Sequence, residues 1–466
     1  MAAVMRIIAA LLSGVMLAQA HSLEPIWQLA WAAPIPLLLA VPGANRVGSL
    51  VLGALAGAGS TAFMIGYFYD LGGIVDVAAL VGLKTLIWSA AAFCHRTAVR
   101  GMPAWLGVFA FPALLAGIET LIGAISPHGS AGAFAYSQIE FLPAVQTASL
   151  GGAPAVTFVV CLFASGLAVM IARRNWISAL APVVIVTGLL VWGALRIPPP
   201  AKPAAGDIGV ALLAHDSFAF DASNWRMAWD AYATATERAA EAGANVIVLP
   251  EKIATLTASE TSEALRPLND IAAEHGVVIV AGAVAADRHF SYNRAWFFSA
   301  AGVRSYNKRH LVPGLEAGLQ RGMADLYSDV GGIRMGVAIC KDMDFPALGR
   351  RYGSYGATLV LVPAWDFGTD AWLHSRMAML RGVESGFWMA RSAREGLMLV
   401  SDPYGRVTAQ QRSTAEMSLL ATLVPLQKPM RTIYVRIGDA FGWTCLGAGL
   451  LLCVVSLVLG RRARRA

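Results

Sequence analysis

The stretch Met335-Gly-Val-Ala-Ile-Cys340 is the most informative part of the polar half of this chain. Its mostly apolar residues predict a buried strand, and the run ends on a cysteine, a residue whose thiolate is a strong nucleophile. Upstream, Glu251 closes the run VIVLPE and Lys308 lies in the run YNKRHLVP. A nucleophile, a carboxylate and an ammonium are the groups needed for acyl transfer through a thioester. The sequence therefore predicts one site that these three residues share.

The composition indicates a membrane protein that also carries a polar domain. Of the 466 residues, 57% are hydrophobic and 14% are charged, and the mean hydropathy of +0.58 is high for a soluble protein. Of the five cysteines, only Cys340 lies in the polar part, so that part forms no internal disulfide. The sequence shows neither metal-ligand spacing nor a cofactor motif, and we expect no metal and no cofactor.

Eight apolar stretches have the length of a membrane-spanning helix, about 20 residues. They are residues 3–20, 26–42, 47–68, 73–94, 104–126, 149–172, 176–195 and 440–460. The first could instead be a cleaved signal peptide, because it ends in a small-residue pattern. The second stretch follows within six residues, however, which favours a helical hairpin. We expect a seven-span domain at 1–195, and a last span with a basic tail at 433–466.

Positive residues alternate between the short loops. Arg46, the loop 95–100, the pair Arg173-Arg174 and the tail 461–466 are basic, whereas the intervening loops contain no Lys or Arg. By the positive-inside rule, both termini are expected in the cytoplasm of a bacterial cell and the polar domain on the periplasmic side of its inner membrane. The same distribution accounts for the net charge of +7, so nucleic-acid binding is not expected.

The polar domain is expected at 207–432, after a Pro-rich linker at 196–206. Its strand-like runs are 207–215, 245–251, 276–284, 294–300, 333–340, 357–364, 396–402 and 418–425. Helices are expected from Asp221-Ala-Ser-Asn224, a capping sequence, to Gly243, and over 259–275 and 371–391. Strands that alternate with helices predict an α/β sandwich.

Each candidate residue has an ordinary structural explanation when it is taken alone. Glu251 could be a solvated carboxylate at a strand end, Lys308 a loop lysine and Cys340 a small core residue. Taken together, the three residues could supply the nucleophile, the base and the oxyanion-stabilising group of an acyl transfer. A thiol of ordinary pKa is mostly protonated at neutral pH, so Cys340 needs a base or a cation beside it. Glu251 could be that base, and Lys308 could hold the oxyanion of each tetrahedral intermediate.

These segments resemble the nitrilase, or carbon–nitrogen hydrolase, superfamily, whose triad is Glu, Lys and Cys in this order. The matching segments are VIVLPE (246–251), YNKRHLVPGLE (306–316), GVAICKDMDFP (336–346) and RGVESG (381–386). The resemblance covers residues 207 to about 425 and implies an α-β-β-α sandwich with Glu251, Lys308 and Cys340 as catalytic residues. It also matches Glu316 to a second glutamate near the triad lysine, for which a plain loop carboxylate is the alternative.

The membrane half resembles the apolipoprotein N-acyltransferase family. The matching segments are 10–40, the loop AYSQIEFLPAVQTASLGG (135–152) and RTIYVRIGDAFGW (431–443). Eight spans with the nitrilase-like domain between the last two are also that family's architecture. The resemblance implies that Cys340 takes an acyl chain from a phospholipid and passes it to the N-terminal amine of a diacylglyceryl lipoprotein. Phospholipid, lipoprotein and membrane lipid are therefore the expected partners.

Several positions depart from the family pattern. Lys341-Asp342 follow the nucleophile in place of Tyr-Glu, Lys252 replaces a small hydroxyl residue after the catalytic glutamate, and 362–368 replaces an Asn-x-x-Trp-Phe stretch. The segment from Glu316 to 333 is also compact. Lys341 is expected to favour the thiolate, with Asp342 partly offsetting it by pairing or proximity.

These departures leave the triad chemistry in place and the acyl donor and acceptor open. A membrane-tethered amidase or nitrilase-like hydrolase, in which water attacks the thioester, is the alternative enzyme. A catalytically inactive scaffold is a third interpretation, and the intact triad argues against it.

Overall fold

The structure is a computed structural model that describes residues 2–174, 176–200, 204, 206–217, 225–425 and 428–462. The chain forms two compact units, one of Met1–Ser126, Ser130–Ile197 and Ile437–Ala466, the other of Pro127–Gly129 and Pro198–Arg436. The domain limits expected at 195, 206 and 432 stay a prediction. The expected capping sequence at 221–224 and most of the basic tail lie outside the described residues.

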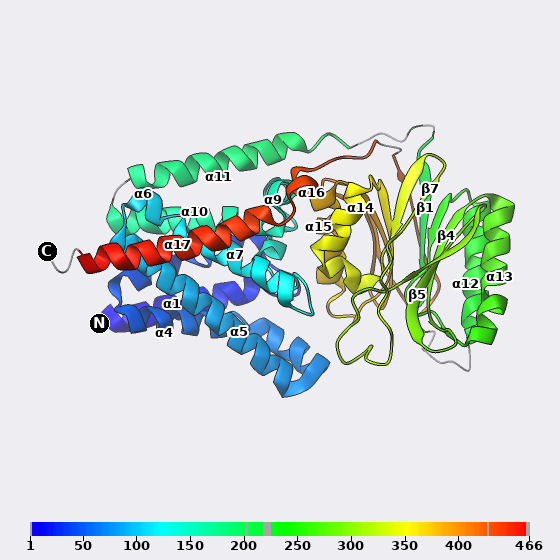
Figure 1. The fold of residues 1–466 in the computed structure, drawn as a ribbon, viewed down its shortest axis with the longest axis horizontal. Coiled ribbons are helices and arrows are strands. Elements are labelled where there is room, and N and C mark those ends of the chain that lie inside the picture. Colours follow the sequence, from blue (N-terminus) through cyan, green and yellow to red (C-terminus); the bar gives the residue numbers. More distant parts are fainter. Residues whose placement is uncertain are drawn as a thin grey trace. The chain divides into compact units, whose positions relative to one another are not determined.

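The first unit is built from apolar helices (Figure 1). Its long helices are α1 (Ala2–Ala20), α4 (Arg46–Gly59), α5 (Ile65–Gly101), α7 (Ala110–Ile125), α10 (Ala153–Arg173), α11 (Ile177–Arg196) and α17 (Ala440–Arg462). In the described part of the chain, six helical stretches are long and apolar enough to cross a membrane, and Trp27–Gly43 is a shorter apolar one. Reaching the eight predicted spans requires adding that shorter stretch and counting Arg46–Gly101 as two.

The stretch from α4 to the end of α5 doubles back on itself within the segment where the sequence predicted a loop. The loop expected at 68–73 is helical up to a kink at Gly72 and Gly73, and Gly73 has a φ of 67°, which favours glycine. The limbs on either side pack closely. A Cβ on Gly53 would lie 2.5 Å from the carbonyl oxygen of Trp88, so only glycine allows this approach of the two backbones.

The loop after α7 is fixed to the helices of the first unit by polar contacts. Glu119 of α7 accepts hydrogen bonds from the Phe134 N–H and from the Thr157 hydroxyl, each at 2.6 Å. The Gln138 side-chain oxygen accepts one from the Trp31 indole at 2.7 Å. These contacts hold the 3₁₀ turn Phe134–Gln138, which contains the YSQ part of the loop singled out in the sequence.

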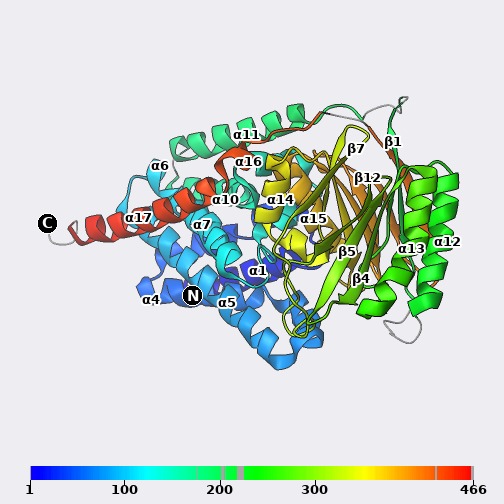
Figure 2. The ribbon, with the colours of Figure 1, turned by 45° about the vertical axis from the view of Figure 1, so that its right-hand side comes forward.

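The second unit contains two stacked β-sheets (Figures 1 and 2). The strands of the first are β1 (Ile208–Ala214), β2 (Val246–Val248), β3 (Thr255–Leu256), β4 (Val278–Ala286), β5 (Ser291–Ser299), β6 (Gly302–Asn307) and β13 (Ser418–Val424). Those of the second are β7 (Leu326–Val330), β8 (Ile333–Val337), β9 (Leu359–Trp365), β10 (Trp388–Arg394), β11 (Leu397–Ser401) and β12 (Val407–Arg412). The orders are β13-β1-β2-β4-β5-β6, with β3 beside β4, and β12-β11-β10-β9-β8-β7.

Two helices cover the outer face of each sheet. The helices α12 (Trp225–Glu241) and α13 (Ala258–His275) pack on the first sheet, and α14 (Pro346–Ser354) and α15 (Ala371–Ser385) pack on the second. Alternation along the strands builds the layers. In β2, Val246 and Val248 enter the core between the sheets, whereas Ile247 faces the helices. The predicted α-β-β-α sandwich beside a helical membrane domain is thus confirmed.

Three local predictions were wrong. The helix expected at 371–391 ends at Gly386, whose φ of 81° starts a turn, and β10 begins at Trp388. The strand expected to reach Cys340 stops at Val337, and Cys340 opens a 3₁₀ turn. Five further strands of the described residues, β3, β6, β7, β10 and β12, were not predicted.

Candidate active site

The three predicted catalytic residues follow strands that end at one edge of the sandwich. Glu251 follows β2, Lys308 follows β6 and Cys340 follows β8. β2 is parallel to β4, and β6 also runs parallel to β4 because each is antiparallel to the intervening β5. Carboxyl ends of such strands gather ligand-binding groups. The Glu251 N–H also donates to the carbonyl of Ala364 on β9 at 3.2 Å, which ties the first sheet to the second at this edge.

A buried network of charges joins the two glutamates to the lysine. Lys308 Nζ lies 2.8 Å from Glu251 Oε1 and 3.0 Å from Glu316 Oε2, and the three residues are at most 2% exposed. Asn293 of β5 donates its side-chain amide to both carboxylates, at 2.7 Å to Glu316 Oε1. Buried charges are tolerated only when they are paired and hydrogen-bonded. Glu316 thus lies beside Lys308, as the resemblance implied.

The pKa shifts indicate which groups carry protons at rest. Burial favours a neutral Lys308, but Glu251, Cys340 and Glu316 outweigh it, so the pKa of Lys308 is raised well above its ordinary value. Burial, together with the charge of Glu251, raises the pKa of the Cys340 thiol, against the opposing effect of Lys308 and Arg391. At neutral pH the resting site therefore holds an ammonium and a neutral thiol. Cys340 needs a base to react rather than a cation alone.

The backbone at Cys340 is in the left-handed region, with a φ of 43°. Asp342 holds this turn, because its carboxylate accepts the Ile339 N–H at 3.1 Å and the Tyr306 hydroxyl at 2.7 Å. It also accepts the His310 N–H at 2.9 Å. The turn is thereby fixed to the segment that carries Lys308, and the conformational cost of such a φ is borne by the surrounding contacts.

Asp342 does not pair with its neighbour Lys341, which was one of the two ways in which it was expected to offset the lysine's charge. Lys341 Nζ lies 3.5 Å from Asp344 Oδ2 instead. The charges that act on the pKa of Cys340 are those of Glu251, Lys308, Arg391 and Asp366. The two residues that depart from the family pattern therefore have separate structural roles. Asp342 fixes the turn at Cys340 by hydrogen bonds, and Lys341 forms an ion pair with Asp344.

The stretch 362–368 supplies a second buried charge network beside the nucleophile. The Cys340 thiol donates to the Trp365 carbonyl at 3.5 Å. The next residue, Asp366, accepts both arms of the Arg391 guanidinium, one at 2.9 Å. Burial opposes ionisation of Asp366, but Arg391 and His374 outweigh it and lower its pKa to about 2. Asn293 and Arg391 were missed in the sequence, since neither lies in a run with recognisable chemistry.

Among the described residues, two groups of side chains have the composition of a metal site. One is Glu237, Glu274 and His275, the other Asp366, Asp370 and His374. In the second group Arg391 already occupies both oxygens of Asp366. Burial opposes protonation of His374, but the Asp366 hydrogen bond and the nearby carboxylates raise its pKa to about 9, so it is a cation at neutral pH. These residues suit an ion-pair network rather than a metal.

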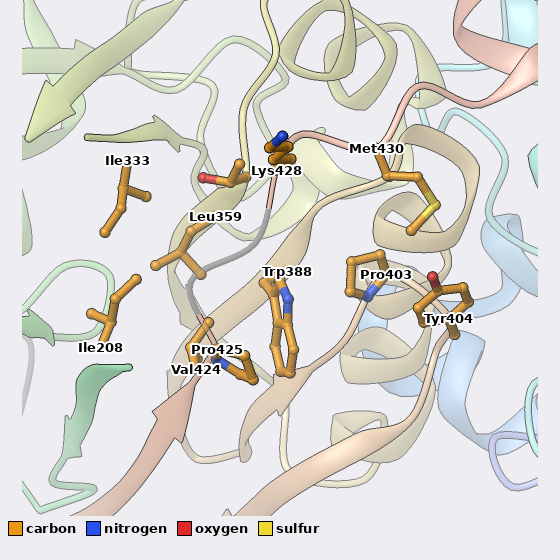
Figure 3. A pocket seen from close by; sticks show the side chains of 12 residues that line it. Ile208, Ile333, Leu359, Trp388, Pro403, Tyr404, Val424, Pro425, Lys428 and Met430 are labelled. Atoms are coloured by element: carbon orange, nitrogen blue, oxygen red, sulfur yellow. The ribbon is translucent and has the colours of Figure 1, made fainter. Parts of the chain in front are cut away.

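A cavity of about 290 Å³ lies at the other edge of the sandwich (Figure 3). Its lining includes the first residues of four strands, Ile208, Ile333, Leu359 and Trp388. The triad residues follow the last residues of their strands, so this cavity is not where Cys340 would meet a substrate.

Comparison with known proteins defines the class first. Residues 209–429 match the carbon–nitrogen hydrolase family. A solved amidase from Nesterenkonia sp. is 23% identical and matches 49% of this chain and 94% of its own, with a TM-score of 0.43. A 2-oxoglutaramate amidase from Bacillus subtilis is 29% identical over 36% of this chain and 73% of its own. By the family match, residues 209–429 form a carbon–nitrogen hydrolase domain.

Other matches extend over the helical unit. Residues 13–166 match the N-terminal domain of apolipoprotein N-acyltransferase. The apolipoprotein N-acyltransferase of Geobacter metallireducens is 25% identical over 96% of this chain and 94% of its own. That of Bradyrhizobium diazoefficiens is 27% identical over 77% of this chain and 78% of its own. The chain belongs to the apolipoprotein N-acyltransferase family of membrane acyltransferases.

Proposed function

We propose that this protein transfers a fatty acyl chain from a phospholipid, through a thioester on Cys340, to the N-terminal amine of a diacylglyceryl lipoprotein. The observation that carries the proposal is the buried cluster of Glu251, Lys308 and Glu316 beside Cys340, in a chain that also carries apolar helices of membrane-spanning length. The match of one apolipoprotein N-acyltransferase to 96% of the chain, which includes both parts, supports it.

In the first half-reaction Cys340 takes the acyl group. Glu251 accepts the thiol proton while the sulfur attacks the ester carbonyl carbon, since the neutral thiol is a poor nucleophile. The protonated Lys308 stabilises the negative oxygen of the tetrahedral intermediate. The ester C–O bond then breaks, Glu251 returns the proton to the departing oxygen, and a lysophospholipid leaves.

In the second half-reaction an amine receives the acyl group. The amine nitrogen attacks the thioester carbonyl, Glu251 accepts a proton from it, and Lys308 again faces the developing oxyanion. The C–S bond breaks, the amide leaves, and the proton returns to the sulfur. The same groups therefore serve both halves of a ping-pong reaction.

The proposal includes the orientation predicted from the loop charges. The catalytic unit would face the periplasm of a bacterial cell, with both termini in the cytoplasm. Lipoproteins anchored in the outer leaflet of the inner membrane would then be on the same side as Cys340.

A membrane-tethered hydrolase is the alternative, and the similarity of the catalytic unit to amidases favours it. Incubation of the purified protein with a phospholipid labelled in its acyl chains and a diacylglyceryl peptide distinguishes the two. We expect label in the peptide amide, and none with Cys340→Ala. Release of free fatty acid without labelled peptide, together with hydrolysis of a small amide, would favour the hydrolase.

A further inference from the structure

Lys252, the residue after the catalytic glutamate, adopts an unusual backbone conformation. Its φ is 52°, in the left-handed region that side chains other than glycine rarely adopt. The turn is held by β4, because the Ile253 N–H donates to the Gly282 carbonyl at 2.8 Å and the Gly282 N–H donates to the Pro250 carbonyl at 3.2 Å. A Cβ on Gly282 would lie 2.8 Å from the Pro250 oxygen, so the approach of the two backbones fixes where Lys252 points.

The Lys252 side chain reaches into the triad network. Its Nζ lies 2.6 Å from Glu316 Oε1, and the side chain is only 13% exposed. Glu316 already receives the Lys308 ammonium, the Asn293 amide and the Val312 N–H. Both of its carboxylate oxygens are therefore engaged on the buried side of the site.

The charges of the network balance only when Lys252 is included. Two buried carboxylates, Glu251 and Glu316, share the single ammonium of Lys308, which alone would leave one negative charge in excess. An uncompensated buried charge is costly, and a negative one disfavours the thiolate of Cys340. The ammonium of Lys252 supplies the missing positive charge.

We propose that Lys252 is a positioning residue that compensates Glu316, and thereby leaves the charge of Lys308 available to Glu251 and to the oxyanion. This inference rests on the proposed acyl-transfer role of the triad. It gives a function to a lysine at the position where the family pattern has a small hydroxyl residue.

The charged groups around the site set how the reactivity of Cys340 depends on pH. Glu316 faces Lys308 and Lys252, and burial, which opposes its ionisation, is outweighed by these two lysines, so its pKa is lowered to about 2. Cys340 faces Glu251 and Lys308 on one side and Arg391 and Asp366 on the other. Lys252 itself lies beside Arg394, whose guanidinium donates a hydrogen bond to the Lys252 carbonyl at 3.4 Å. Both cations lie over the ring of Trp365.

The test measures the reactivity of Cys340 without any acyl donor. Iodoacetamide alkylation of Cys340 in the full-length protein is followed by peptide mass spectrometry between about pH 6 and about pH 10. Without Lys252, Glu316 would draw on the charge of Lys308, which lowers the pKa of the Cys340 thiol. Lys252→Met should therefore slow alkylation, by up to about tenfold, wherever Glu316 is ionised. Lys252→Arg, which keeps the charge, should react at close to the wild-type rate.

A second background makes the result independent of any loss of folding. In Glu316→Gln protein the carboxylate that needs compensation is gone, so adding Lys252→Met should cause no further slowing. An equal slowing in both backgrounds, or a Lys252→Arg protein as slow as Lys252→Met, would overturn the inference. Because iodoacetamide needs no acyl acceptor, a wild-type protein that fails to transfer acyl groups would contradict the proposed function without touching this result.

Discussion

At the scale of single residues, the site places a neutral thiol beside a buried cluster of two glutamates and a lysine. Cys340 is held as a thiol by burial and by Glu251, while Lys308 is held as an ammonium. The proton on sulfur must therefore move during the reaction, and Glu251 is the group placed to accept it. Removing each neighbour should affect the chemistry in a different way.

Lys308→Ala should slow formation of the acyl-enzyme by about 100- to 1,000-fold, the usual cost of losing an oxyanion-stabilising group. Single-turnover release of lysophospholipid measures this rate. Lys428→Ala is the matched control, because Lys428 lines the cavity at the opposite edge of the sandwich. Equal losses in the two variants would mean that the charge of Lys308 has no specific role.

Asn293→Ala should slow the same step by about 10- to 100-fold, because hydrogen bonds to charged groups contribute about 1.5–3 kcal/mol. The lost amide donates to both Glu251 and Glu316, which would then share only the Lys308 ammonium. Asn293→Asp should be at least as damaging, since it adds a negative charge to the cluster. Wild-type rates in both variants would contradict the role assigned to this amide.

At the scale of elements, a charge clamp joins the end of β9 to the first turns of α15. His374 of α15 lies 3.3 Å from Asp370 Oδ2 and 3.7 Å from Asp366 Oδ1. Its pKa of about 9 exceeds the ordinary 6.5. A raised histidine pKa stabilises the fold fully below about pH 6.5, and this stabilisation is lost as the pH rises through about 9.

The free energy of unfolding should therefore fall between about pH 6.5 and about pH 9.5, by an amount on the order of 3 kcal/mol at most from this residue. Melting temperatures of the full-length protein across this range measure the effect. His374→Gln should lower the melting temperature at the acidic end and flatten the pH profile. A variant with the wild-type pH dependence would show that His374 is not the titrating group.

The strands that were predicted from the sequence are those whose apolar residues are also buried in the structure. The continuous apolar runs of β1, β4 and β9 predicted strands directly. The apolar runs that end at Glu251 and at Cys340 likewise located two of the three triad residues. β10 was not predicted as a strand because its sequence WMARSAR contains two arginines, which are rarely buried. Only the folded structure provides the buried partner, Asp366, that Arg391 needs. The contacts of Asn293 likewise depend on segments distant in sequence.

At the scale of the whole molecule, the composition predicted a membrane protein with a break between two apolar stretches at 68–73. The structure shows that this break is a kink in a continuous helical stretch rather than a loop. Hydropathy marks where apolar helix lies, but the break at Gly72 and Gly73 depends on backbone dihedral angles that apolar composition does not encode. The predicted orientation is a separate claim that rests on loop charges alone.

Fusions test that orientation. A reporter that is active only outside the cytoplasm should be active when joined after Gly206 and silent when joined after Arg174, because the intervening span would move the junction across the membrane. Activity at Arg174 with silence at Gly206 would reverse the orientation and remove the lipoprotein from the reach of Cys340.

The most direct test of the proposed function is the mass of the intact protein after incubation with phospholipid alone, without any acceptor. We expect an added fatty acyl chain on Cys340, located by peptide mapping, which disappears when a diacylglyceryl peptide is added and never forms in Cys340→Ala protein. Acylation that persists in Cys340→Ala, or a wild-type protein that transfers acyl chains without modification of Cys340, would contradict the thioester route.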